Sequence, residues 1–140
     1  MSSPPPNRTT TVHVTKSTSL TSPPSGPQTP GMVRRDAIVG HSGVSLCASR
    51  MTAAPRSASA VHHHGAQDTV VYAVSGSGGA LVSDGGRTRV ALEPGDYALI
   101  PAGVEHQEVN DGDEEIVWSI VRSGSSPVVV NLSGWGGEEV

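Results

Sequence analysis

The sequence predicts an all-β fold, either a sandwich or a barrel of short antiparallel strands. From Met32 onward, short runs rich in β-branched residues alternate with turn signals such as Ser-Gly, Asp-Gly and Pro-Gly, a spacing typical of these folds. Glycine or proline interrupts nearly every window long enough for an amphipathic helix. The chain has no Phe, so Val, Ile, Leu and Ala must build most of the core, and such small side chains suit a narrow barrel.

The length of 140 residues fits one domain with a single core. Residues 1–31 are rich in Ser, Thr and Pro and bury too little apolar surface to order themselves, so we predict a flexible, disordered N-terminal tail. Within it, Val12 and Val14 alternate with polar residues over 10–16, a pattern that would form an edge strand against a partner sheet. Residues 32–140 are the predicted barrel domain.

The predicted strands of this domain follow one another along the chain. They are VSLCASRM (44–51), TVVYAV (69–74), GALVSD (79–84), RTRVAL (87–92), DYALIP (96–101), EIVWSIV (115–121) and PVVVNL (127–132). The bulky pieces of the core are expected to be Tyr72, Tyr97, Trp118 and Trp135.

Charge and cysteine content exclude several classes of function. A net charge of -4 without a Lys/Arg run argues against a nucleic-acid or anionic-membrane surface and favours small molecules or proteins as partners. Cys47 is the only cysteine, so neither an intrachain disulfide nor a tetrathiolate zinc site is possible. No signal-peptide core and no membrane-length apolar stretch is present, which predicts a soluble, cytoplasmic protein.

Three consecutive histidines, His62 to His64, precede one of the predicted strands. Side chains alternate along a strand, so His62 and His64 share one face while His63 points to the other. Two neutral imidazoles that point inward could provide two ligands of a divalent metal site, whereas a cluster that points outward would simply be solvated.

A second informative stretch is GDYALIPAGVEHQEVN, residues 95–110. Its fixed points are Gly95, Pro101, Gly103, His106 and Asn110, separated by five, one, two and three residues. Proline and glycine form a tight turn, so His106 begins the strand that returns beside the one just completed. Asn110 is expected to bridge backbone groups in the following loop.

This spacing resembles the second of the two sequence motifs of the cupin superfamily at every fixed position. The first cupin motif has two histidines one residue apart, a glutamate after three or four residues, and a glycine six residues later. Here His62, His64 and Gly76 match it, and Thr69 stands in the glutamate position. The resemblance runs from about residue 35 to 125.

The resemblance implies a small single-domain cupin of the conserved-barrel type, with a double-stranded β-helix or jelly-roll barrel. It also implies that His62, His64 and His106 bind a metal. Asp68 is a possible further ligand if a bulge near Gly65 turns it inward, although a set of three histidines is preferred. A centre without a carboxylate ligand would keep its full positive charge and favour an anionic or enolate-forming ligand.

For function, the resemblance implies a metal-dependent enzyme acting on a small oxygenated or anionic molecule in the barrel cavity. Dioxygenase-like oxidation is preferred because three histidines suit Fe(II), but isomerase or lyase chemistry, and Mn, Ni or Zn, stay open. The alternative is a noncatalytic small-molecule-binding module. Small cupins commonly form homodimers, and residues 10–16 together with 127–132 could supply the interface.

Candidate substrate contacts come from the arginines, any of which could hold a carboxylate at the mouth of a pocket. These are Arg34, Arg35, Arg50, Arg87, Arg89 and Arg122. Arg50 is preferred because it lies on the strand before the histidines. No dedicated base is visible in the sequence. Glu105, beside His106, is only a candidate for that role, and the catalytic residues are unassigned.

Overall fold

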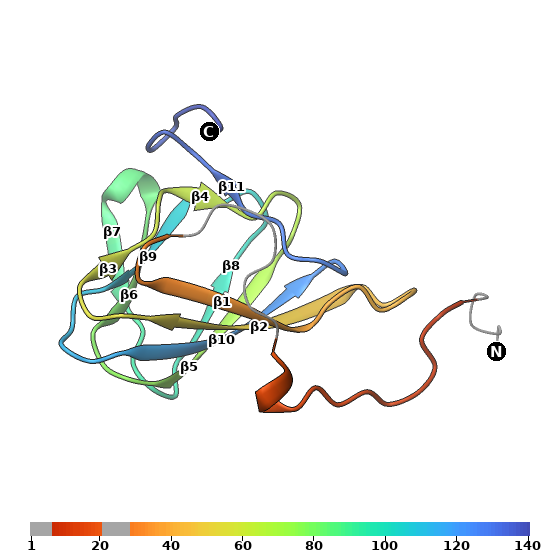
Figure 1. The fold of residues 1–140 in the computed structure, drawn as a ribbon. Helices are drawn as coiled ribbons and strands as arrows, with labels where there is room; N and C mark the ends of the chain where they lie inside the picture. Colours follow the sequence, from red (N-terminus) through yellow and green to blue (C-terminus); the bar gives the residue numbers. More distant parts are fainter. Residues whose placement is uncertain (1–6, 21–28) are drawn as a thin grey trace.

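The structure is a computed structural model that describes residues 7–20 and 29–140, and it holds two antiparallel sheets that face each other (Figure 1). The first sheet has the order β1 (Met32–Ile38), β2 (Leu46–Ala53), β10 (Ile116–Ser123), β5 (Thr69–Ser75) and β8 (Tyr97–Ile100). The second has the order β11 (Val130–Asn131), β4 (His62–His63), β9 (His106–Asn110), β6 (Gly79–Ser83) and β7 (Thr88–Ala91), and β3 (Ser57–Ala58) pairs with β9. Two short 3₁₀ helices, η1 (Ser17–Ser19) and η2 (Asp84–Gly86), complete the described elements.

From β4 onward the chain passes repeatedly between the two sheets. Strands β5, β8 and β10 belong to the first sheet, and β4, β6, β7, β9 and β11 belong to the second. This is the arrangement of a double-stranded β-helix, so the predicted all-β jelly-roll class is confirmed.

Each predicted run contains a strand, although the last shrinks to the two-residue β11. Strand β1 was not predicted, because the sequence Arg34-Arg35-Asp36 hides its alternation of apolar and polar residues. Met32 and Asp36 are both buried, and Arg34 lies between them on the same face. The missed strand therefore carries charged groups into the interior, which an apolar pattern cannot reveal.

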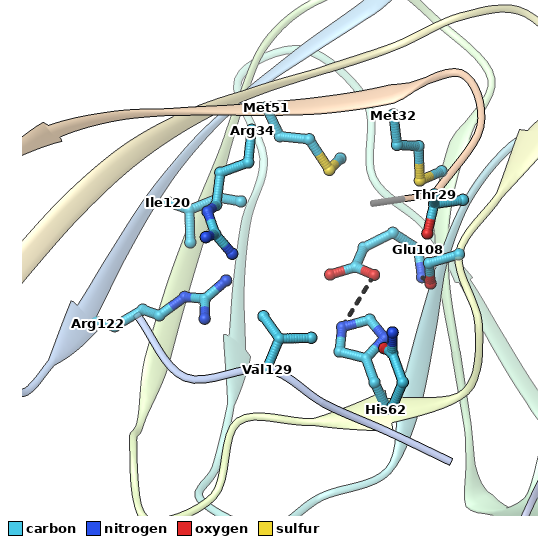
Figure 2. Close-up of a pocket in the computed structure, with 11 residues that line it drawn as sticks. Thr29, Met32, Arg34, Met51, His62, Glu108, Ile120, Arg122 and Val129 are labelled. Carbon is cyan, nitrogen blue, oxygen red and sulfur yellow. Dashed lines mark hydrogen bonds and ion pairs between the residues drawn. The ribbon is translucent and has the colours of Figure 1, made fainter. Parts of the chain in front are cut away.

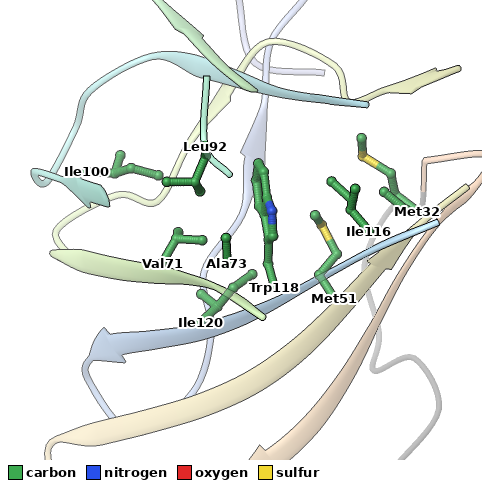
Figure 3. Packing of buried hydrophobic residues seen from close by; sticks show 10 residues of the cluster. Met32, Met51, Val71, Ala73, Leu92, Ile100, Ile116, Trp118 and Ile120 are labelled. Carbon is green, nitrogen blue, oxygen red and sulfur yellow. The ribbon is translucent and has the colours of Figure 1, made fainter. Parts of the chain in front are cut away.

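The core is centred on Trp118 of β10, between the two sheets (Figure 3). Trp118 is fully buried, with Met51 of β2 and Ala73 of β5 as its register partners on either side. The expectation that Tyr72 and Tyr97 fill the core is wrong, since neither belongs to the cluster around Trp118 and Tyr97 is 72% exposed. Its register partner Tyr72 is half-buried and contacts it with ring centroids 4.7 Å apart, because both residues alternate onto the outer face of the sheet.

The loops around β9 have the geometry that their sequence predicts. Gly103 has φ +75° in the turn closed by the bond from the Val104 N–H to the Pro101 carbonyl, at 3.2 Å. The buried Asn110 side chain donates to the carbonyls of Ala53, Ala54 and Glu114 and accepts from the Gly112 N–H. Asn110 thus bridges backbone groups, as expected.

Residues 7–20 of the predicted tail lie along the connection between β1 and β2 and contain no strand. The Thr9 N–H donates to the Ser42 carbonyl at 2.7 Å, and the Thr15 hydroxyl donates to the Ala37 carbonyl at 2.7 Å. Residues 1–6 and 21–28, where the rest of that prediction falls, lie outside the described residues. Among the described helices, none is long and apolar enough to cross a membrane. The dimer interface stays a prediction.

Candidate metal centre

Four buried side chains meet inside the barrel at its second sheet. His62 of β4 is the register partner of His106 on β9, and His64 follows β4 by one residue. Glu108 lies two residues after His106, on the same face of β9. One ligand atom from each of these residues lies within 4.8 Å of all the others, so the four groups can reach a common point.

The predicted alternation of the histidine run is confirmed. His62 and His64 are buried inside, whereas the half-buried His63 points away, with its Nδ1 accepting a hydrogen bond from the Gly65 N–H at 3.0 Å. The structure thus separates two inward imidazoles from one outward imidazole.

Backbone carbonyls orient two of the inward imidazoles. Nδ1 of His62 lies 2.8 Å from the Ala60 carbonyl, and Nδ1 of His106 lies 2.9 Å from the Val104 carbonyl. A carbonyl can only accept, so Nδ1 must carry the proton in each ring. In the neutral tautomer Nε2 is then the free lone pair, which is the arrangement that metal-binding histidines need.

Thr69 orients the third imidazole. Its hydroxyl lies 2.8 Å from Nδ1 of His64, and both side chains are buried. Burial, followed by the nearby charges of Arg122 and His106, lowers the pKa of His64 to about 2, so this ring stays neutral. The residue at the family's glutamate position is therefore a support for His64.

Glu108 supplies the carboxylate of the cluster. Its Oε2 lies 3.2 Å from Nε2 of His62, and its Oε1 lies 3.5 Å from Nε2 of His106. Burial alone would raise the pKa of Glu108, but the charge and hydrogen bond of His62, together with the proximity of His106, hold it well below its usual range. The carboxylate is ionised, and it raises the pKa of His62 against the opposing effect of burial.

Two buried nitrogens in the cluster test whether a metal fits. Nε2 of His64 and Nε2 of His106 have no hydrogen-bond partner among the described residues. Leaving buried polar atoms unpaired is unfavourable. Because these two nitrogens converge beside a carboxylate, a bound cation would satisfy them. Three imidazoles and one carboxylate are ligands that divalent first-row metals accept, and the cluster therefore fits such an ion.

Sequence analysis did not single out Glu108, whose carboxylate lies in the cluster where a centre without a carboxylate was expected. The signal was available, because the alternation that pairs His62 with His64 also pairs His106 with Glu108 two residues later. The family's usual glutamate position, occupied by Thr69, lies on β5 and gives no indication of a carboxylate on β9.

The structure does not bring the other three candidates to the cluster. Asp68 is exposed, and its carboxylate accepts a hydrogen bond from the Ala102 N–H at 2.9 Å, because no bulge turns it inward. Arg50 alternates with the buried Ser49 and Met51 on β2 and therefore lies on the outer face of the sheet. Glu105 accepts from the Gly136 N–H at 2.7 Å and is not part of the cluster.

Two cavities adjoin the cluster. The first, of about 70 Å³, borders His62 and Glu108 and includes Arg34 and Arg122 in its wall (Figure 2). The second, of about 540 Å³, reaches His106 from the side of β7 and β8 and is lined largely by aliphatic residues such as Leu99. The cluster thus adjoins a small cavity with charged residues in its wall and a larger cavity with a mainly aliphatic lining.

Together, the fold and the cluster define a double-stranded β-helix barrel with a buried site of three histidines and one carboxylate. The chain belongs to the cupin family, since residues 49–122 match the sequence model of the Cupin domain. The resemblance read from the two motifs is therefore confirmed.

Solved structures agree with this assignment. A sugar phosphate isomerase of the cupin superfamily from Silicibacter pomeroyi DSS-3 is 29% identical over 68% of this chain and 60% of that chain, with a TM-score of 0.55. This chain therefore spans less than two thirds of that protein's length. The polyketide cyclase RemF from Streptomyces resistomycificus is 20% identical over 88% of this chain and 84% of that one, with a TM-score of 0.68, and shares the fold.

A third structure, KdgF from Halomonas sp., is 19% identical over 81% of this chain and 94% of that chain, with a TM-score of 0.63. It too shows a shared fold. No curated protein matches the sequence.

Proposed function

We propose that this cupin binds one divalent metal ion through His62, His64, His106 and Glu108 and uses it in an enzymatic reaction on a small oxygenated or anionic molecule. The observation that carries the proposal is the pair of buried, unpartnered Nε2 atoms of His64 and His106 beside an ionised carboxylate. Backbone carbonyls fix the ring tautomers of His62 and His106, and the Thr69 hydroxyl orients the ring of His64, which supports the same conclusion.

A divalent ion in this site supplies Lewis acidity and open coordination positions for substrate. The chain's own residues provide the rest. The hydrogen bonds to Nδ1 hold the imidazoles of His62, His64 and His106 in place, so little reorganisation is needed on binding. Met32, Met51 and Ile120 of the apolar core line the cavity beside His62 and Glu108 and give that side of the site apolar walls.

Fe(II) is the proposed metal, with Mn, Ni and Zn as the competing outcomes. Imidazole and carboxylate ligands together are typical of non-haem Fe(II) sites with open positions, which supports dioxygenase-like chemistry. Isomerase or lyase chemistry would use the same ligands for proton transfer. An isomerase and a cyclase are among the structures to which this chain is similar.

Elemental analysis of the purified protein tests the metal site directly. We expect close to one divalent ion per chain, and His106→Ala should lose most of it. His63→Ala is the matched control, because His63 belongs to the same histidine run but points away from the cluster. Metal that is retained in His106→Ala, or lost equally in His63→Ala, would contradict the ligand set.

Turnover separates an enzyme from a noncatalytic binding module. The enzyme predicts product formation that stops on chelation and returns with one particular divalent ion. Ligand-dependent thermal stabilisation without product, over a panel of small oxo and hydroxy acids, would instead identify the module.

A further inference from the structure

Two arginines point into the small cavity beside the metal cluster. Arg34 on β1 and Arg122 on β10 lie in the wall of the cavity of about 70 Å³, together with His62 and Glu108 (Figure 2). Arg122 is only 4% exposed, and the Nε atoms of both arginines are buried without a hydrogen-bond partner among the described residues. An unused donor on a buried guanidinium is costly. Nε of Arg50 on the outer face is also unpartnered among the described residues, so the feature that marks Arg34 and Arg122 as ligand contacts is their place in the wall of the cavity beside the cluster.

The known contacts of these arginines leave donors for a ligand. One Nη atom of Arg122 donates to the Val128 carbonyl at 2.9 Å, which fixes the direction of the side chain. Nε of Arg34 lies 3.4 Å from Oδ1 of Asp36 without forming a hydrogen bond, and that same oxygen accepts from the Ser49 hydroxyl at 2.9 Å. Both guanidinium groups are therefore held in place without being saturated.

The charges around the cavity also favour an anion once the metal site is filled. The positive charges of Arg34 and Arg122 are offset by the nearby carboxylates of Asp36 and Glu108. A divalent ion at the histidines would leave its own charge uncompensated. Arg34 and Arg122 line the same cavity, and burial, followed by the charge of Arg34, lowers the pKa of Arg122 to about 10.

We propose that Arg34 and Arg122 bind the carboxylate of a short-chain oxo or hydroxy acid in this cavity, next to the metal cluster. The inference rests on the proposed function and adds the class of substrate. Planar guanidinium groups match a carboxylate with paired hydrogen bonds, which a lysine could not reproduce.

The size of the cavity limits the acid to a few carbon atoms. A volume of about 70 Å³ corresponds to roughly five to seven water-sized spheres. Met32, Met51, Ile120 and Val129 supply apolar walls, and Thr29, Ser59 and Asn131 add a few polar groups. A two- to four-carbon acid fits this volume, whereas a sugar phosphate or citrate would not.

Calorimetric titration tests the proposal with three probes: pyruvate, citrate and inorganic phosphate. The metal-containing protein should bind pyruvate more tightly than the other two. Arg34→Gln and Arg122→Lys should each weaken pyruvate binding by about ten- to a hundredfold, since each removes hydrogen bonds to a charged group. Arg122→Lys keeps the charge at this buried position, and Arg34→Gln provides a second reading if that variant folds poorly.

Arg50→Gln is the matched control, since Arg50 lies on the neighbouring strand β2 but on the outer face of the same sheet. Pyruvate affinity should be unchanged in this variant. Equal weakening in Arg50→Gln, tighter binding of phosphate than of pyruvate, or no binding of pyruvate by the wild-type protein would each overturn the proposal.

Metal content, measured on every sample, separates the two proposals. Variants that keep their metal but lose pyruvate binding support the arginine assignment. Wild-type protein that holds metal without binding pyruvate refutes this inference and leaves the metal site standing. Protein without metal refutes the proposed function, and the same titrations on the metal-free chain then decide the role of the arginines by themselves.

Discussion

The two ends of the inner face of the first sheet differ in chemistry although they share one alternation pattern. At one end, the apolar end, β2, β10 and β5 carry Met51, Ala53, Ala73, Ile116 and Trp118. At the other end, the polar end, the same face carries Asp36, Cys47, Ser49, Thr69 and Arg122, all buried. Strand geometry dictates only that these side chains face inward.

The comparison teaches that burial has two purposes in this barrel. Packing around Trp118 lowers the free energy of the folded state through apolar contact. Burying Arg122 and Thr69 beside the cluster does not, because polar groups lose water on burial. The polar end is therefore maintained for its site, at some expense in stability, and substitutions at the two ends should have opposite signatures.

Trp118→Ala should give the largest effect on stability. Removing this fully buried ring leaves a cavity at the centre of the core, and we expect about 3–5 kcal/mol of lost stability. Urea unfolding of the chelated protein measures it without a contribution from bound metal. Tyr97→Ala, at an exposed aromatic on the outer face, is the control and should cost less than about 1 kcal/mol. Similar losses in the two variants would contradict the apolar end as the source of stability.

His64 should make the chelated protein less stable in acid. Its pKa is lowered from 6.5 to about 2, so below about pH 6.5 the unfolded chain binds a proton on this ring that the folded chain does not. The free energy of unfolding should therefore decrease by up to about 1.4 kcal/mol for each unit by which the pH is lowered below that value. Urea unfolding between pH 6.5 and 4.5 should show this slope in the wild type and in His63→Gln, and a flatter line in His64→Gln.

The neighbouring groups act outside that pH window. Glu108, whose pKa is lowered from 4.5, contributes stability above 4.5 and loses it only as pH falls through its folded value. His62, whose pKa is raised from 6.5, contributes fully below 6.5 and loses that contribution as pH rises through its folded value. A slope that persists in His64→Gln would refute the assignment to this ring.

Glu108→Gln tests the carboxylate that sequence analysis missed. We expect metal affinity to fall by at least about tenfold, because a neutral amide replaces the charged group of the cluster. A competition titration against a chelator of known affinity measures the change. Glu105→Gln, three residues away and hydrogen-bonded to Gly136, should leave the affinity as it is. Equal affinities in wild type and Glu108→Gln would remove this residue from the ligand set.

Thr69→Val should give the smallest of these effects. It keeps the shape of the side chain but removes the hydroxyl that orients His64, and metal affinity should fall by about tenfold or less. The same chelator competition measures it. Thr52→Val, at an outward position of β2, is the matched control. Unchanged affinity in Thr69→Val would show that His64 needs no support from this residue.

Much of the barrel was predictable because its strands obey local rules. The alternation at His62 and His64, the turn at Gly103 and the bridging role of Asn110 all follow from a few neighbouring residues. Strand β1 was not predicted from the sequence because Arg34 and Asp36 are polar residues that face inward. The usual pattern of inward apolar residues is absent where the inward residues belong to a site and not to the core.

The sequence by itself determined the barrel class, the facing of the histidines and the family, since each depends on spacing along a single stretch of chain. Only the tertiary structure decided that Glu108 supplies the carboxylate while Thr69 supports His64, and that Arg34 and Arg122 rather than Arg50 adjoin the cavity. The physical reason is that these choices depend on how strands distant in sequence are registered across two packed sheets. Local alternation says whether a side chain points inward, but the packing of the sheets sets which inward groups meet.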